Sequence, residues 1–294
     1  MVPSTRLKQK PESDLNFEAL GTQWYISTPG TITKSVEAQI HEHLEVIDKT
    51  WSRFRNDSLV ATMSSSAGTY KIDTRDSQLL AWYSELYSAT NGKVSPLIGQ
   101  TISDAGYDQV YSLTQKQAIH QTPAWGDVIE LTGASLSVRR PALIDVGAAG
   151  KGYAVDAICD LLNANDIHAY TIDAGGDIRT KGPLQRIGLE HPFDATKVIG
   201  AVNLTSRSIC GSATNRRAWG DWHHIIDPST SLPTTNIIAT WVIADTAMIA
   251  DGLATALFFV EPDKLTHLAD FLYVIIRSDG TVMYSKHKTI ELFI

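Results

Sequence analysis

Short runs with the alternating pattern of β-strands fill most of this chain, and only a few longer segments carry the apolar spacing of helices. The helical segments are residues 33–54, 77–90, 150–163 and 247–260. Strand-like runs are expected at residues 17–28, 128–131, 135–138, 142–144, 169–173, 186–190, 198–204, 206–210, 237–244, 273–277 and 281–284. Because hairpin-like runs mix with isolated helices instead of alternating with them, the pattern predicts an α+β fold. We expect mixed or antiparallel sheets flanked by a few long helices.

Residues 15–294 are expected to form a single domain, with two closely associated subdomains as the alternative, because no linker clearly divides the chain. A length of 294 residues fits either arrangement. Residues 1–14 are polar and contain Pro3 and Pro11, so we expect a disordered or artificial N-terminal segment there.

No apolar run reaches the roughly 18 residues that a membrane-spanning helix needs, since the longest candidate is broken by Asp245 and Asp251. Near its start the sequence has neither the apolar core of a signal peptide nor a lipidation cysteine. We therefore expect a cytoplasmic protein, or an exported or membrane-anchored one if a signal was removed.

The charge balance argues against a broad contact with nucleic acid or an anionic membrane. The chain has 25 Lys and Arg residues against 32 Asp and Glu residues, a formal net charge of −7. A local cationic pocket for a small phosphate is compatible with this balance. Cys159 and Cys210 show no metal-binding spacing, and we expect both to be small buried apolar residues.

A glycine-rich segment, residues 145–152, lies between a predicted strand and a predicted helix. Small residues at a helix N-terminus leave backbone amides open to a phosphate, and Lys151 adds a full positive charge. The segment is not a Walker A loop, because Asp145 stands where the first glycine belongs and Gly152 stands where Ser or Thr would hold magnesium. The alternative is a tight turn with a solvated lysine.

A second glycine pair, Gly175 and Gly176, follows an apolar strand and is flanked by Asp173 and Asp177. Glycines at such a position allow a ligand or another chain segment to approach the backbone closely. A plain hairpin turn explains the same residues equally well.

Two adjacent histidines, His223 and His224, precede the rigid turn at Asp227 and Pro228. An imidazole can act as a base near neutral pH, although a single histidine is more often structural. Since neighbouring side chains on a strand point to opposite faces, we expect at most one of the two to face a site.

Asp251 and Thr255 lie four residues apart in a strongly apolar helical segment, so both fall on one helix face. A carboxylate and a hydroxyl are hard oxygen donors that suit Mg²⁺ or Ca²⁺. A carboxylate in apolar surroundings is costly unless a partner compensates it, which favours a metal site over a solvated Asp.

These four segments, in this order, resemble the motifs of the ApbE family, the FAD:protein FMN transferases. The matching residues are 145–156, 173–178, 224–231 and 250–256, with weaker matches at 20–22, 52–59 and 95–97. The resemblance extends over about residues 15 to 285. The chain departs from the family pattern at residues 212–216, where Ser-Ala-Thr-Asn-Arg replaces the usual Ser-Gly-x-Tyr-Glu, and at Gly150, Ser231 and Val94-Ser95.

The resemblance implies an α+β fold that binds FAD as substrate with Mg²⁺ beside its diphosphate. It also implies transfer of FMN to a threonine hydroxyl of an acceptor protein that carries a Thr-containing flavinylation motif, with release of AMP. The alternatives are an FAD pyrophosphatase that forms FMN and AMP, and a flavin-binding protein without catalysis.

The resemblance also assigns roles to individual residues. His224 matches the motif histidine and is the candidate catalytic base. The magnesium-ligand positions are Asp251, Thr255 and the backbone carbonyl of Ala148. The cofactor-binding positions are Leu20, Asp145, Lys151, Gly175, Gly176 and Ile225, with Leu20 as a wall of the flavin or adenine pocket and Ile225 as a backbone contact.

Overall fold

An eight-stranded sheet forms the centre of the computed structural model, which describes residues 15–293. Its strand order is β1-β2-β6-β7-β10-β15-β16-β17, and every neighbouring pair is antiparallel. The strands are β1 (Leu15–Ala19), β2 (Thr22–Ser27), β6 (Tyr170–Ala174), β7 (Asp177–Lys181), β10 (Ser208–Ala213), β15 (Ile237–Ala244), β16 (Leu272–Arg277) and β17 (Val282–Tyr284).

Smaller sheets complete the β structure. One has the order β18-β9-β8 and another the order β3-β5-β4, and two short ribbons pair β11 with β12 and β13 with β14. Their bounds are β3 (Gly68–Lys71), β4 (Ile129–Thr132), β5 (Ser135–Val138), β8 (Gln185–His191), β9 (Asp194–Leu204), β11 (Ala218–Trp219), β12 (Trp222–His223), β13 (Ile226–Asp227), β14 (Leu232–Pro233) and β18 (Ile290–Leu292).

The α-helices are α1 (Lys34–Trp51), α2 (Leu59–Ser65), α3 (Thr74–Ala89), α4 (Gly99–Asp104), α5 (Trp125–Val128), α6 (Gly150–Ala164) and α7 (Ala247–Ala256). Four of them begin at a side chain that accepts a hydrogen bond from the backbone amide three residues later. These N-cap residues are Thr33, Ser58, Asp73 and Thr246. A polar N-cap compensates an amide that has no partner within the helix, which explains why the helices start at these positions.

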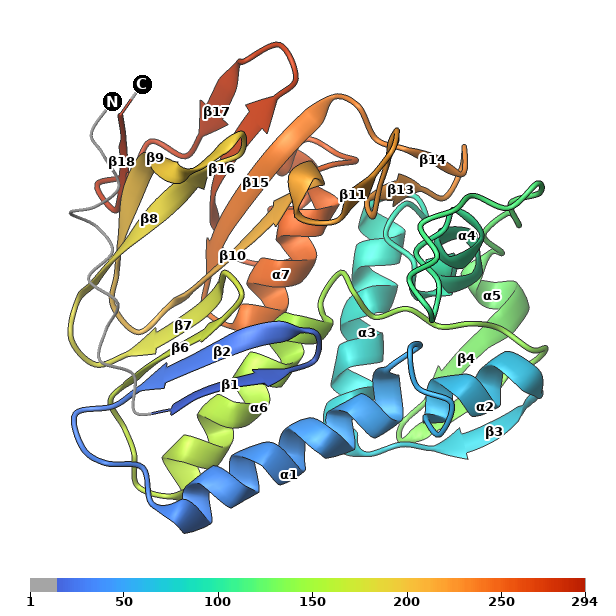
Figure 1. Ribbon diagram of the computed structural model, residues 1–294, viewed down its shortest axis with the longest axis horizontal. Helices are drawn as coiled ribbons and strands as arrows, with labels where there is room; N and C mark the ends of the chain where they lie inside the picture. Colours follow the sequence, from blue (N-terminus) through green and yellow to red (C-terminus); the bar gives the residue numbers. More distant parts are fainter. Residues whose placement is uncertain (1–14, 294) are drawn as a thin grey trace.

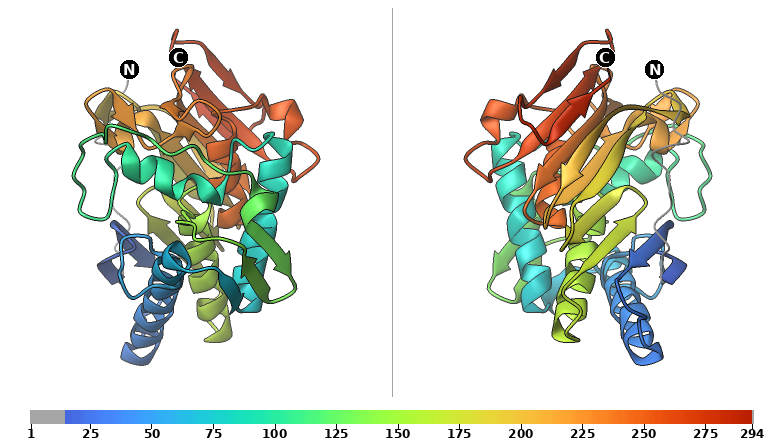
Figure 2. Two further views of the ribbon diagram at one scale, coloured as in Figure 1. Left: turned by 90° about the vertical axis from the view of Figure 1, so that its right-hand side faces the viewer. Right: turned by 90° about the vertical axis from the view of Figure 1, so that its left-hand side faces the viewer.

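The central sheet separates two hydrophobic cores (Figures 1 and 2). Adjacent residues of one strand point to opposite faces, so Cys210 joins the core shared with the helices while Ile209 joins the core under β8, β9 and β18. Val242 and Ile243 divide in the same way. Helices therefore cover one face of the sheet and a second β layer covers the other.

The structure confirms the expected α+β fold and the helices at residues 33–54, 77–90 and 150–163, within a few residues at their ends. Helix α7 is shorter than predicted and ends at Ala256. Cys159 and Cys210 are buried free thiols, as expected. The prediction for residues 1–14 lies outside the described part of the chain. None of the helices within residues 15–293 is both long enough and apolar enough to cross a membrane.

Two strand predictions were wrong. Residues 17–28 form a hairpin instead of one strand, because Leu20 and Gly21 adopt φ values of 50° and 70° and reverse the chain between β1 and β2. Residues 142–144 form no strand, because the backbone amides of Ala142 and Asp145 bond to helical segments and not to a neighbouring strand: Ala142 donates to the carbonyl of Met63 in α2, and Asp145 donates to that of Pro96 at the start of a short 3-10 helix. Neither partner can be recognised from local apolar alternation.

We predict that Gly152→Ala destabilises the fold, because Gly152 lies where α6 crosses α7. A Cβ at this position would collide with the backbone carbonyl of Ala247. Overpacking of a tight contact costs about 1–3 kcal/mol and more when backbone must move. The measurement is the midpoint of urea unfolding.

Gly126→Ala is the matched control, since no heavy atom beyond its chain neighbours lies within 4 Å of a Cβ on Gly126 in α5. This change should leave stability unchanged or raise it by up to about 1 kcal/mol through helix propensity. Equal midpoints for Gly152→Ala and the wild type would show that the helix crossing tolerates a methyl group.

Candidate functional site

A cavity of about 1310 Å³ opens between the central sheet, the start of α6, the later part of α7, and the hairpin of β8 and β9. Pockets for drug-sized ligands measure roughly 300–1,000 Å³, so this cavity has room for a larger molecule. All but one of the residues assigned to a site from the sequence line it: Asp145, Ala148, Lys151, Gly175, Gly176, His224, Ile225, Asp251 and Thr255. Leu20 is the exception.

Leu20, the predicted wall residue, is not among the residues that line the cavity. It occupies the turn between β1 and β2, and its side chain packs against the large hydrophobic core. The next residues, Gly21 and Thr22, line the cavity instead. Gly175 lies so close to Thr22 that a Cβ at Gly175 would collide with the threonine hydroxyl. The glycine pair is thus both a hairpin turn and part of the cavity wall.

The crossing of α6 and α7 positions the polar groups at the back of the cavity. The backbone amide of Gly152 in α6 donates to Asp251 Oδ2 in α7 at 3.0 Å. In the opposite direction, the Asp156 carboxylate of α6 accepts from the amides of Ala247 and Met248 at the start of α7, at 3.0 and 2.8 Å. Each helix therefore holds the other through a carboxylate.

Lys151 lies between two buried carboxylates at this crossing. Its ammonium pairs with Asp177 Oδ2 and lies 3.7 Å from Asp251 Oδ1, while Asp177 and Asp251 are only 1% and 2% exposed. Burial alone would lower the pKa of Lys151, but Asp177 and Asp251 outweigh it and raise that pKa. One cation faces two carboxylates, so the cluster retains negative charge.

Burial and the nearby carboxylate of Asp177 together raise the pKa of Asp251 to about 7, although Lys151 acts in the opposite direction. Asp177 was not assigned to the site from the sequence, although it follows the glycine pair directly. A carboxylate with such a raised pKa gains more from an added cation than an exposed one does, because burial leaves it poorly compensated.

The three oxygen donors that the sequence analysis assigned to a metal lie beside this cluster. Thr255 Oγ1 donates to the backbone carbonyl of Ala148 at 3.4 Å, and Asp251 lies one turn before Thr255 on α7. Carboxylate, hydroxyl and carbonyl oxygens are the donors that hard divalent cations prefer. Asp177 Oδ1, buried and without a hydrogen-bond partner among the described residues, adds a further uncompensated oxygen nearby. This donor set fits a divalent cation.

The expectation of open backbone amides in the glycine-rich turn was wrong. Five backbone amides of this segment already have acceptors within the protein. The hydroxyl of Tyr83 accepts from Ala148 and Ala149, and the carboxylates of Asp145 and Asp251 accept from Gly147 and Gly152. The amide of Gly150 donates to the carbonyl of Val146. The buried hydroxyl of Tyr83 reaches the turn from α3, and the local pattern of the turn holds no sign of it. Positive charge at this position therefore comes from Lys151 more than from free amides.

Asp145 is held by Arg53, a residue that the sequence analysis did not assign to the site. Arg53 Nε donates to Asp145 Oδ2, and Arg53 is 6% exposed. The guanidinium lies 4.1 Å from the ring centre of Phe54 and 4.9 Å from that of Tyr107. Stacking and the ion pair together fix Arg53, which compensates the charge of Asp145.

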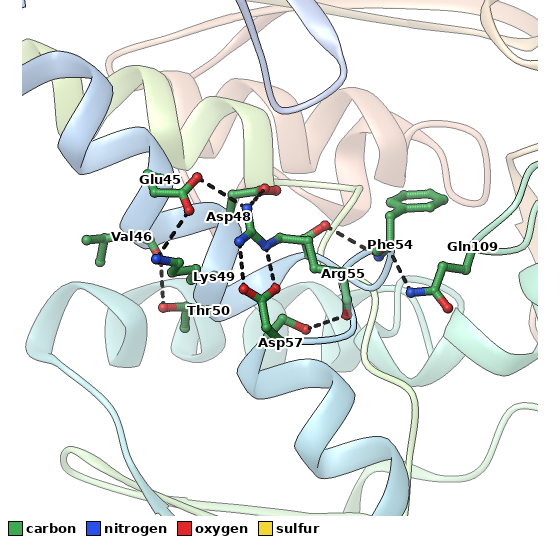
Figure 3. Close-up of polar contacts among 11 residues, drawn as sticks. Glu45, Val46, Asp48, Lys49, Thr50, Phe54, Arg55, Asp57 and Gln109 are labelled. Atoms are coloured by element: carbon green, nitrogen blue, oxygen red, sulfur yellow. Dashed lines mark hydrogen bonds and ion pairs between the residues drawn. The ribbon is translucent and has the colours of Figure 1, made fainter.

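Arg55, in the weaker family match at residues 52–59, plays a different part (Figure 3). It binds Asp57 through two bonds of 2.8 Å and Asp48 at 3.0 Å. These contacts clamp the end of α1 to the segment that leads into α2. Arg55 therefore orders the chain around Arg53 and Phe54 and does not line the cavity.

The two histidines have separate roles, as expected. His223 accepts from the amide of Ile225 at Nδ1 and donates from Nε2 to the carbonyl of Thr234 at 2.7 Å, so its ring is fully bonded. The Ile225 amide is therefore occupied within the protein, and its carbonyl accepts from Thr234, although Ile225 lies at the cavity wall.

His224 faces the cavity. Its buried Nδ1 has no hydrogen-bond partner among residues 15–293. Burial, Arg217 and His223 lower the pKa of His224 to about 3, so the ring is neutral near pH 7. A neutral ring with an unpartnered nitrogen can accept a proton from a bound group.

The segment that departs from the family pattern brings two arginines to the cavity. Arg216 pairs with Glu190 of β8 at 3.4 Å. Arg217 lies 5.6 Å from the ring centre of Tyr107, and no carboxylate of the described residues lies within 4.0 Å of its guanidinium. Both line the cavity, and Arg216 stands at the position where the family pattern has Glu, so this chain places positive charge there.

Comparisons with known proteins show the family of the chain. A model of the ApbE family matches residues 20–275. The chain is 24% identical to an FAD:protein FMN transferase of Vibrio cholerae, with 94% of this chain and 92% of the relative covered. It is 26% identical to an FAD:protein FMN transferase of Haemophilus influenzae, with 93% and 89% covered.

Solved structures show the same fold. The ApbE protein of Thermotoga maritima matches with a TM-score of 0.80 at 23% identity, over 92% of this chain and 96% of that one. The flavin transferase ApbE of Vibrio cholerae matches with a TM-score of 0.75 at 22% identity over the same shares.

We predict that Tyr83→Phe destabilises the protein by about 1–3 kcal/mol, because the amide of Ala148 loses its acceptor and that of Ala149 keeps only the carbonyl of Val146. Urea unfolding measures this difference. Tyr70→Phe is the control, since its hydroxyl bonds only to Ser66 at an exposed position. Equal losses in the two variants would contradict a structural role of Tyr83 in the turn.

Proposed function

This chain belongs to the ApbE family, and we propose that it transfers FMN from FAD to an acceptor protein. Two relatives carry this activity in their names, and the chain matches each of them over most of its length. The cavity supports the proposal, since it is large enough for a dinucleotide and holds a cationic lysine beside buried carboxylates. The observation that carries the proposal is the meeting of Asp251, Thr255 and the Ala148 carbonyl at the cavity wall.

Magnesium is the cation proposed for this site, held by Asp251, Thr255 and the carbonyl of Ala148. When bound, it would supply positive charge against the diphosphate of FAD. Lys151 adds a second positive charge to the same region of the cavity. Mg²⁺ and Lys151 would both offset the negative charge of the diphosphate.

The acceptor group is proposed to be a threonine hydroxyl. Its oxygen forms a bond to the phosphorus on the FMN side, and the bond from that phosphorus to the bridging oxygen breaks. AMP departs with the bridging oxygen, and the hydroxyl proton passes to His224. A positioned base of this kind contributes roughly 10²–10⁴ to the rate.

The environment of His224 suits this role when the substrate is present. Without a ligand, Arg217 and His223 help to keep the pKa of His224 low. A diphosphate in the cavity would add negative charge near the ring, and negative charge stabilises the protonated form. Substrate binding therefore makes His224 a stronger base at the time it is needed.

Mass spectrometry tests the proposal. The wild-type protein, FAD and Mg²⁺ are incubated with short peptides that carry one central threonine among randomised neighbours. We expect peptides whose mass has increased by one FMN group, together with AMP. Free FMN and AMP without an adduct would indicate a pyrophosphatase, and intact FAD would indicate a binding protein. His224→Gln should retain FAD binding and lose most of the adduct.

We predict that Asp251→Asn abolishes stabilisation by Mg²⁺. A ligand at about 100 times its dissociation constant stabilises a protein by about 2.7 kcal/mol, so Mg²⁺ should raise the melting temperature of the wild type. Asp245→Asn is the control, because Asp245 precedes the same helix but is exposed and pairs with Arg207. An equal response to Mg²⁺ in the Asp251→Asn variant would remove Asp251 from the metal site.

A further inference from the structure

Strand β8 lies at the open edge of its sheet and runs along the cavity. The order β18-β9-β8 leaves one side of β8 without a neighbouring strand, and its backbone hydrogen bonds within residues 15–293 go to β9. Four consecutive residues, 185–188, line the cavity together with Glu190. Because side chains alternate between two faces, four consecutive lining residues mean that the cavity follows the strand edge itself.

The direction of the free backbone groups follows from the pairing of β9. The amide of Asn203 bonds away from β8, to the segment leading into β18. Peptide groups alternate in direction along an antiparallel strand, so the N–H and C=O groups of the neighbouring Val202 point toward β8. Val202 is paired with Ile187, and the N–H and C=O groups of Ile187 therefore point toward β9. Arg186 and Gly188, on either side of Ile187, direct their N–H and C=O groups outward.

An unpaired edge readily accepts another extended chain, and folded proteins usually protect such edges. Here the edge faces a cavity, where a whole sheet of another molecule cannot reach it but a single extended segment can. Main-chain pairing provides affinity largely independent of side chains. The proposed reaction needs such a segment, since a threonine of another protein has to enter the same cavity.

Contacts connect the end of β8 to the proposed base. Glu190 pairs with Arg216, and the Asn215 side chain donates to the carbonyl of Pro192, just beyond the strand. Next in this segment, the carbonyl of Arg217 accepts from the amide of His224. A chain paired along β8 therefore runs toward the segment that holds His224.

We propose that an extended segment of the acceptor protein binds as an additional strand on the outer edge of β8, paired to the outward groups of Arg186 and Gly188. This inference rests on the proposed function and names the way in which its protein substrate is held. The partner is accordingly a flexible loop or terminus that carries the threonine, and not a folded surface.

An N-methyl scan tests the pairing without altering the enzyme. The probe is the peptide most strongly labelled with FMN in the randomised set described above, resynthesised with one N-methyl group at each position in turn. We expect labelling to fall about five- to tenfold at alternate positions and to change little at those between, because only every second amide bonds to the edge. Labelling that is indifferent to N-methylation, or that lacks the two-residue period, would overturn the proposal.

Two variants at one position test the enzyme side. Arg186→Pro removes an outward N–H and retains every bond to β9, and proline is tolerated at a sheet edge. Arg186→Ala removes the same side chain and its ion pair with Glu291 but keeps the N–H. We expect Arg186→Pro to raise KM for the peptide about five- to tenfold above that of Arg186→Ala. Equal KM values would overturn the proposal.

FAD binding is measured through the quenching of flavin fluorescence. This measurement distinguishes a failure of the edge proposal from a failure of the proposed transferase function. Both variants should bind FAD like the wild type. A parallel loss of FAD binding in Arg186→Pro would assign the edge to the dinucleotide and overturn the proposal. A randomised peptide set in which no peptide is labelled would overturn the transferase function itself, and the edge proposal with it.

Discussion

The contact between α6 and α7 at Gly152 is the constraint on which the site depends. Only a residue without a side chain allows the two helices to approach so closely, and the same glycine donates its amide to Asp251. The approach brings Lys151 of one helix to Asp251 of the other, with Asp177 of β7 against both. Buried charges are stable only when they compensate one another, so the packing of the helices and the electrostatics of the cavity are inseparable.

Much of the site could be predicted because its residues follow local rules. Asp251 and Thr255 lie one helical turn apart. Gly175 and Gly176 directly follow the strand pattern of residues 169–173, which predicts a turn there. The two adjacent histidines also led to the prediction that at most one of them would face a site. Periodicity likewise located the main helices, since each buries an apolar face, α1 against α6 and α3 against α7.

The remainder depends on partners that are distant in sequence. Tyr83 closes the glycine-rich turn from α3, and Arg53 holds Asp145 from the end of α1. Both lie in segments whose apolar or basic character has an ordinary local explanation, so nothing in the sequence linked them to the turn. Leu20 lies at the reversal between β1 and β2, which the sequence pattern did not predict, and its side chain packs against the largest core.

Besides the two cores that the central sheet separates, the described residues form a third and smaller core, and the functional groups belong to different cores. Lys151 and Asp251 come from helices of the largest core, whereas His224 lies between ribbons that pack on a small one formed by Ile102, Ala105, Tyr107, Trp219 and Ile226. Small cores have low local opening free energies. Mild heat or denaturant can therefore release the histidine while the helix crossing stays intact, so that inactivation precedes global denaturation.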